Sequence, residues 1–144
     1  MSLKDLSFRE KSALINLVAL SALLIFTLNI IWPFFSGYEE AILEMKPLWG
    51  AVIFFIVLQV IGHGVVAARD AKEANANADE REKLIVLKSN FYASHVLGFV
   101  VIGYLGISML FQIPFLSIYF VFIAFIVAEI INCISQLILF QRGV

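Results

Sequence analysis

Residues 12–32 read SALINLVALSALLIFTLNIIW, a run that contains no charged side chain. A helix of about 20 apolar residues is long enough to cross the hydrocarbon core of a bilayer. The run is longer than the apolar segment of a signal peptide, about 7–15 residues, and no A-x-A-like cleavage site follows it. We therefore predict that residues 12–32 form a membrane-spanning helix of the mature protein.

Three further long apolar stretches follow, and the last of them is interrupted by one charged residue, Glu129. Hydrophobic residues make up 62% of the 144-residue chain. Ordinary soluble domains are only about 45–50% apolar. No stretch alternates apolar and polar residues, so helices are the remaining way to satisfy a backbone in hydrocarbon. The sequence predicts an all-α, polytopic membrane protein of one domain, with four transmembrane helices in an up-down-up-down bundle. The predicted helices cover residues 12–32, 48–68, 84–111 and 114–140, with an outer loop at 33–47 and an inner loop at 69–83.

Basic residues are unevenly distributed between the two sides of the predicted bundle. Nine of the ten Lys and Arg residues precede the first helix, lie in or beside the inner loop, or follow the fourth helix. Lys46 alone lies in the outer loop. Because loops rich in Lys and Arg stay on the cytoplasmic side, we predict that both termini are cytoplasmic.

The inner loop contains a signal for the start of the third helix. Asn75 and Asn77 favour a break in the chain. Asp79 is a candidate N-cap, and Glu82 three residues later completes a capping-box pattern.

The run DEREKLIVLK at residues 79–88 also carries a resemblance. Together with FREKSA at 8–13 and LILFQRG at 137–143, it resembles a family of small, uncharacterised bacterial integral membrane proteins. The resemblance implies four membrane helices in a bacterial plasma (inner) membrane. It implies no activity and no functional residues.

Polar side chains within the fourth predicted span are candidates for function, because burying them in hydrocarbon costs free energy. Glu129 lies near the middle of that span. Asn132 and Gln136 follow at i+3 and i+7, so the three side chains share one helical face. We expect this face to turn toward the other helices rather than toward lipid.

Two histidines lie in the second and third spans at similar depths, on the order of 10 Å below the inner surface. These are His63 and His95, and Gln59 lies one turn from His63. Because the inner loop joins their two helices, we expect these helices to be neighbours. The sequence thus predicts one intramembrane polar patch, composed of Glu129, His95, His63, Gln59, Asn132 and Gln136.

Three interpretations of this patch stay open. Its members can be hydrogen-bonding links between helices. Glu129 can bind a proton or cation in a transport component that acts as a homo-oligomer. A b-type haem can lie between His63 and His95, with Gly62 and Gly64 leaving room for the macrocycle. We expect a non-enzymatic accessory, regulatory or small-ligand-binding subunit that acts with itself or with another membrane protein.

Other functional classes, such as enzymes, nucleic-acid-binding proteins and metalloproteins, lack support in the sequence. It contains no G-x-S-x-G, H-E-x-x-H or glycine-rich phosphate loop, and no basic segment dense enough for nucleic acid. Cys133 is the only cysteine and lies in the fourth span, which argues against a disulfide within the chain and against a thiolate metal site. A metal site of His63, His95 and Glu129 has no spacing motif behind it. We expect no catalytic residue, no metal and no cofactor apart from the haem alternative.

Overall fold

The computed structural model describes residues 6–35, 45–111 and 117–142. Four of its helices are long and apolar enough to cross a membrane, which confirms the predicted all-α, four-span fold. A fifth helix is a single turn. The helices are α1 (Phe8–Phe35), α2 (Met45–Arg69), α3 (Ala71–Ala74), α4 (Glu80–Phe111) and α5 (Ser117–Arg142).

The helices facing the predicted outer loop are longer than expected. Residues 33–35 belong to α1 and residues 45–47 to α2, so the connection between them is shorter than 33–47. Pro47 lies in the first turn of α2, where its missing N–H removes no helical hydrogen bond. Residues 36–44 of that loop, and residues 114–116 at the predicted start of the fourth helix, lie outside the described residues.

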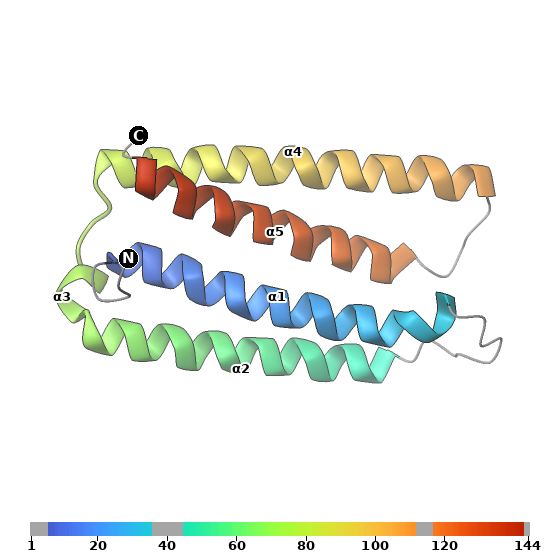
Figure 1. The fold of residues 1–144 in the computed structure, drawn as a ribbon, viewed down its shortest axis with the longest axis horizontal. Coiled ribbons are helices and arrows are strands. Elements are labelled where there is room, and N and C mark those ends of the chain that lie inside the picture. The colour runs from blue at the N-terminus through green and yellow to red at the C-terminus, as the bar shows by residue number, and fades with distance from the viewer. Residues whose placement is uncertain (1–5, 36–44, 112–116, 143–144) are drawn as a thin grey trace.

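The four long helices lie side by side in the order α2, α1, α5, α4, with successive helices antiparallel (Figure 1). Substantial contacts join α1 to α2, α1 to α5 and α4 to α5. The two central helices, α1 and α5, are the most buried, whereas α2 and α4 lie at the edges and are mostly exposed. The molecule is therefore a layer of helices in which each central helix has two main neighbours and each edge helix has one.

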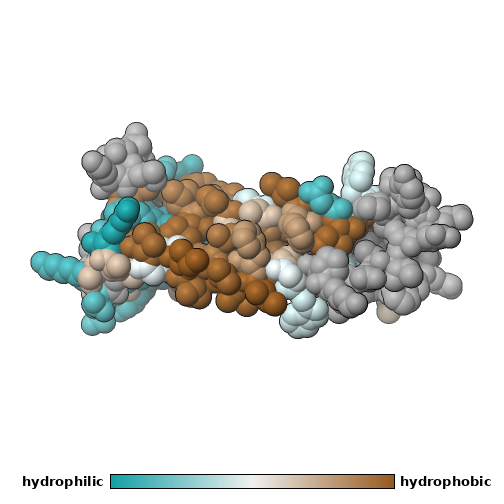
Figure 2. All heavy atoms as spheres, turned by 90° about the horizontal axis from the view of Figure 1, so that it is seen from below, coloured by the Kyte–Doolittle hydropathy of each residue, from teal (hydrophilic) through white to brown (hydrophobic). Residues whose placement is uncertain are grey.

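Apolar packing between the central helices forms the core. Leu20 and Leu23 of α1 are buried in one cluster with Ile126 and Cys133 of α5, and Ala51 of α2 joins them. Figure 2, which views the layer from the edge on which α2 lies, shows an apolar band across its middle. Hydrophilic residues gather at the end that carries α3. This distribution matches a protein whose middle is surrounded by acyl chains.

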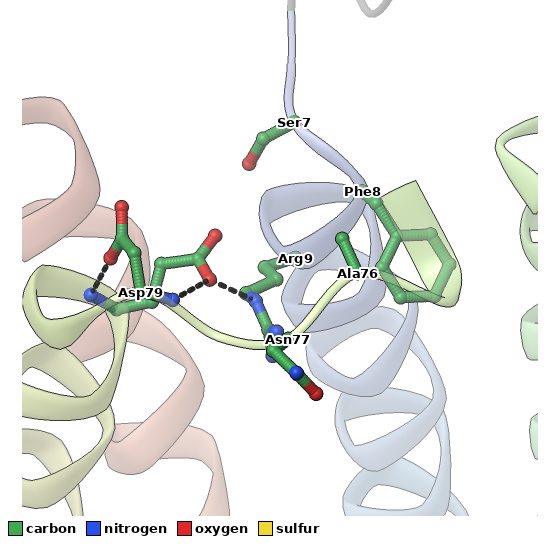
Figure 3. A pocket seen from close by; sticks show the side chains of 7 residues that line it. Ser7, Phe8, Arg9, Ala76, Asn77 and Asp79 are labelled. Carbon is green, nitrogen blue, oxygen red and sulfur yellow. Dashed lines mark hydrogen bonds and ion pairs between the residues drawn. The ribbon is translucent and has the colours of Figure 1, made fainter. Parts of the chain in front are cut away.

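Reciprocal caps start two of the helices at this hydrophilic end. At α4, Glu82 N donates to Asp79 Oδ1 over 2.6 Å and Asp79 N donates to Glu82 Oε2 over 3.1 Å (Figure 3). The predicted capping box is therefore confirmed, and it starts α4 at Glu80 rather than at residue 84. Ser7 and Glu10 form the same pair of bonds at the start of α1.

Two ion pairs attach the start of α1 to its surroundings at this end, one to the first turn of α4 and one to Asp70 in the inner connection. Arg9 Nε lies 2.7 Å from Glu82 Oε2 (Figure 3), and Lys11 Nζ lies 2.9 Å from Asp70 Oδ2. The four side chains are about one quarter to one third exposed. Partly solvated pairs of this kind contribute at most about 1 kcal/mol each. Their main effect is to fix where the connection crosses the end of the layer.

Two glycines on α2 differ in what surrounds them, although they are only two residues apart. A Cβ added at Gly62 would lie 2.7 Å from Ile15 Cγ2 on α1, closer than van der Waals contact allows. A Cβ added at Gly64 would meet nothing within 4 Å. Of these two glycines, Gly62 is therefore the one at which α2 packs closely against α1.

We predict opposite effects of alanine at these two positions. Gly64→Ala should stabilise the protein by about 0.5–1 kcal/mol, because alanine favours the helical backbone. Gly62→Ala should destabilise it by about 1–2 kcal/mol, because overpacking against Ile15 outweighs that gain. The free energy of unfolding in mixed micelles titrated with sodium dodecyl sulfate measures both effects. Equal stabilisation by the two variants would contradict the close α1–α2 contact.

Candidate functional site in the membrane

His63 links α2 to α1 through both of its ring nitrogens. Nε2 lies 2.8 Å from Asn16 Oδ1, and Nδ1 lies 3.2 Å from Ser12 Oγ. An amide oxygen only accepts, whereas a hydroxyl also donates. The partners therefore fit an Nε2–H that donates to Asn16 Oδ1, while the Ser12 hydroxyl can either donate to Nδ1 or accept from it. This arrangement is a hydrogen-bonded link between helices, the first of the three interpretations.

A second polar network links α5 to α4. Asn132 is buried, and its Nδ2 donates to Asn90 Oδ1 over 3.0 Å and to Glu129 Oε2 over 3.3 Å. Gln136 Nε2 donates to Asn132 Oδ1 over 3.1 Å. Three of the predicted patch residues, Glu129, Asn132 and Gln136, are thus joined directly, with Asn90 added from α4.

A pocket of about 410 Å³ lies between α1, α2 and α5. One polar side chain from each helix lines it: Asn16, Gln59 and Glu129. The other lining residues are apolar or the thiol Cys133, and two of them, Phe125 and Ile56, are 51% and 53% exposed. Because exposed side chains of a membrane span face lipid, the pocket opens toward the acyl chains.

The carboxyl group of Glu129 is half-buried and incompletely satisfied. Asn132 donates to Oε2, but within the described residues Oε1 has no donor. None of the ion pairs in the described part of the chain includes Glu129. A negative charge inside a membrane is costly unless it is paired. The pocket therefore contains a carboxyl group with a free acceptor and no countercharge from the described chain.

Gln59 adds a second unmet acceptor to the same pocket. Its Oε1 is buried and, among the residues that the structure describes, has no hydrogen-bond partner. A buried acceptor without a donor is destabilising by about 1–3 kcal/mol. Asn16 and Gln59 also carry amide N–H donors, so the only charged group that lines the pocket is the carboxyl group of Glu129.

The structure does not bring His63 and His95 together. The prediction that their helices are neighbours is wrong, because α1 and α5 lie between α2 and α4 (Figure 1). The connection over residues 70–79 is not a tight hairpin, so it does not force the helices it joins into contact. Gly62 faces Ile15 rather than a planar cofactor. A haem held by these two histidines in one chain therefore has no place in this arrangement.

His95 lies outside both polar networks. It is exposed on α4, its Nδ1 lies 2.8 Å from the backbone oxygen of Phe91, and its ring lies against the ring of Phe91. The predicted patch is thus two networks and one separate residue. In the described ranges, no three His, Cys, Asp or Glu side chains are grouped to hold a metal ion.

Three residues of these networks were not among the predicted site residues. Ser12 and Asn16 are partners of His63, and Asn90 is the partner of Asn132. A signal for the first two exists in the sequence, because Ser12–Asn16 and Gln59–His63 are both i, i+4 polar pairs on antiparallel helices. Nothing in the sequence pairs Asn90 with Asn132, because their contact depends on how α4 packs against α5.

A smaller pocket of about 260 Å³ lies at the hydrophilic end (Figure 3). Residues near the start of α1, such as Arg9, line it together with residues of the connection before α4, such as Asp79, and with Glu82 in the first turn of α4. These charged groups are already engaged in the ion pair and the cap described above. This pocket is therefore better explained by chain attachment than by ligand binding.

Comparison with known proteins leaves the chain without an assigned family. No family model, no curated protein and no solved structure matches it. The resemblance to small bacterial membrane proteins stays a prediction, and the four membrane-spanning helices rest on the length and composition of α1, α2, α4 and α5.

Proposed function

We propose that this protein is a non-enzymatic membrane protein that binds a lipid-soluble small molecule in the pocket between α1, α2 and α5. The observation that carries the proposal is the lining of that pocket: an apolar cavity with Asn16, Gln59 and Glu129 placed on three different helices. Ligand sites typically combine a mostly apolar wall with a few polar groups, in volumes of about 300–1,000 Å³.

The position of the pocket supports uptake from the bilayer. Phe125 and Ile56 are about half exposed at its margin, so a ligand reaches it from the acyl chains rather than from water. Hydrogen bonding between helices accounts for His63 and Asn132, whose partners are on neighbouring helices. It does not account for Glu129, because the one donor to its carboxyl group among the described residues comes from its own helix.

The transport alternative, in which Glu129 binds a proton or cation in a homo-oligomer, stays a prediction, as does assembly with another membrane protein. We include in the proposal a bacterial plasma membrane with cytoplasmic termini. Its support is the gathering of Lys and Arg at the end where α1 starts, α5 ends and α3 lies (Figure 1).

A neutral photoaffinity probe tests binding in the pocket. We expect an aliphatic alcohol that carries an alkyl diazirine to label α2 and α5 at pocket-lining residues in reconstituted protein. Val52→Trp should remove this labelling by filling the pocket. Peptide mass spectrometry after illumination locates the label.

Ile53→Trp is the matched control, because Ile53 is the next residue on α2, is 60% exposed and does not line the pocket. It should leave the labelling unchanged. Even labelling over the exposed faces of all four helices would mean that the pocket contains only bulk lipid, and the proposal would fall.

Cysteine accessibility tests the proposed orientation. In a Cys133→Ser background, Asn77→Cys should stay unlabelled by a membrane-impermeant maleimide in intact cells and should react in inverted vesicles, because Asn77 is exposed in the inner connection. Glu40→Cys, in the outer loop predicted from the sequence, should show the reverse. Reaction of Asn77→Cys in intact cells would place the termini outside.

A further inference from the structure

The charge that lines the pocket between α1, α2 and α5 indicates the chemical class of the ligand as well as the presence of a binding site. From it we infer that the ligand is a lipophilic cation, with Glu129 as its countercharge. This inference rests on the proposed function, because it assigns a chemical class to the occupant of the same pocket.

The first support is the unpaired state of Glu129. Its Oε2 accepts one hydrogen bond from Asn132, and within the described residues its Oε1 accepts none. The ion pairs of Arg9, Lys11 and Lys83 all lie at the hydrophilic end of the layer. A cation in the pocket would supply the countercharge that these basic residues do not.

The second support is the aromatic wall. Phe55, Phe122 and Phe125 line the same pocket as Glu129. The face of an aromatic ring attracts a cation within about 6 Å, and the attraction is stronger when the cation is removed from water. A carboxyl group beside several rings favours positive charge by two independent effects, whereas an anion would be repelled by both.

The depth of Glu129 in the membrane further limits the chemical class of the ligand. Glu129 is thirteen residues before Arg142 at the inner end of α5, which corresponds to about 20 Å along a helix. A lipid whose charged headgroup stays at the membrane surface cannot place that charge so deep. The cation must therefore be one that enters hydrocarbon, with its charge shielded by apolar substituents.

Two ions of matched shape and opposite charge test the inference. Purified protein in an uncharged detergent should bind tetraphenylphosphonium in equilibrium dialysis, corrected for detergent alone, and should not bind tetraphenylborate. Glu129→Gln should weaken tetraphenylphosphonium binding by about tenfold or more, since the charged partner is lost. Glu80→Gln removes the same charge at an exposed site and should change nothing.

A second variant keeps the test independent of any effect of Glu129→Gln on folding. Phe125→Leu should weaken tetraphenylphosphonium binding by about threefold or more, because it removes a ring from the pocket. Phe99→Leu is the matched control, since Phe99 is 78% exposed on α4 and does not line the pocket. Helix content by circular dichroism should be the same in all variants.

The outcomes separate the two proposals. Equal binding of the two ions, or full binding by a folded Glu129→Gln, would overturn the cation inference. If the neutral probe still labels the wild-type pocket and Val52→Trp blocks it, the binding function stands without a cation. If neither the neutral probe nor tetraphenylphosphonium occupies the pocket, both proposals fall.

Discussion

The contact between α1 and α5 is the constraint on which the rest of the structure depends. α2 packs chiefly against α1 and α4 packs chiefly against α5, so this one contact joins two antiparallel helix pairs into a layer. It is made by apolar side chains such as Leu23 and Ile126, whose packing is the main source of association between helices in lipid. The pocket exists because α2 and α5 both flank α1, which leaves a hollow over the helix between them.

A layer of helices has no closed interior in which polar residues can be hidden together. A polar side chain can find its partner at a contact between two neighbouring helices, or it can bond to the backbone of its own helix. His63 and Asn132 bond to side chains of a neighbouring helix, at the α1–α2 and α4–α5 contacts. His95 is exposed and is bonded to the backbone oxygen of Phe91 in its own helix. This geometry explains why one predicted patch became two networks and one isolated histidine.

The sequence predicts local features well and the order of the helices poorly. Long apolar runs with few charges determine which segments span, and the capping pair Asp79 and Glu82 determines where α4 starts, because both signals depend on residues close together in the chain. The neighbours of each helix depend on the packing of surfaces that are apolar on every side, so no periodic stripe identifies them. That is why the sequence pointed to a His63–His95 pairing that the structure lacks, and did not pair Asn90 with Asn132.

The difference between Glu129 and Asn132 is the strongest argument that the pocket has a role beyond packing. Asn132 uses its amide donors and its acceptor to join α5 to α4 and to bond to Gln136. Because its amide is uncharged, these bonds form without placing a charge in the membrane. Within the part of the chain that the structure describes, Glu129 accepts a single hydrogen bond, from its own helix, and bonds to no second helix. Glutamine would therefore serve the same structural purpose at lower cost. A carboxyl group that contributes so little to helix association, yet lines an apolar cavity open to lipid, is what the proposed binding of a ligand in that cavity would account for.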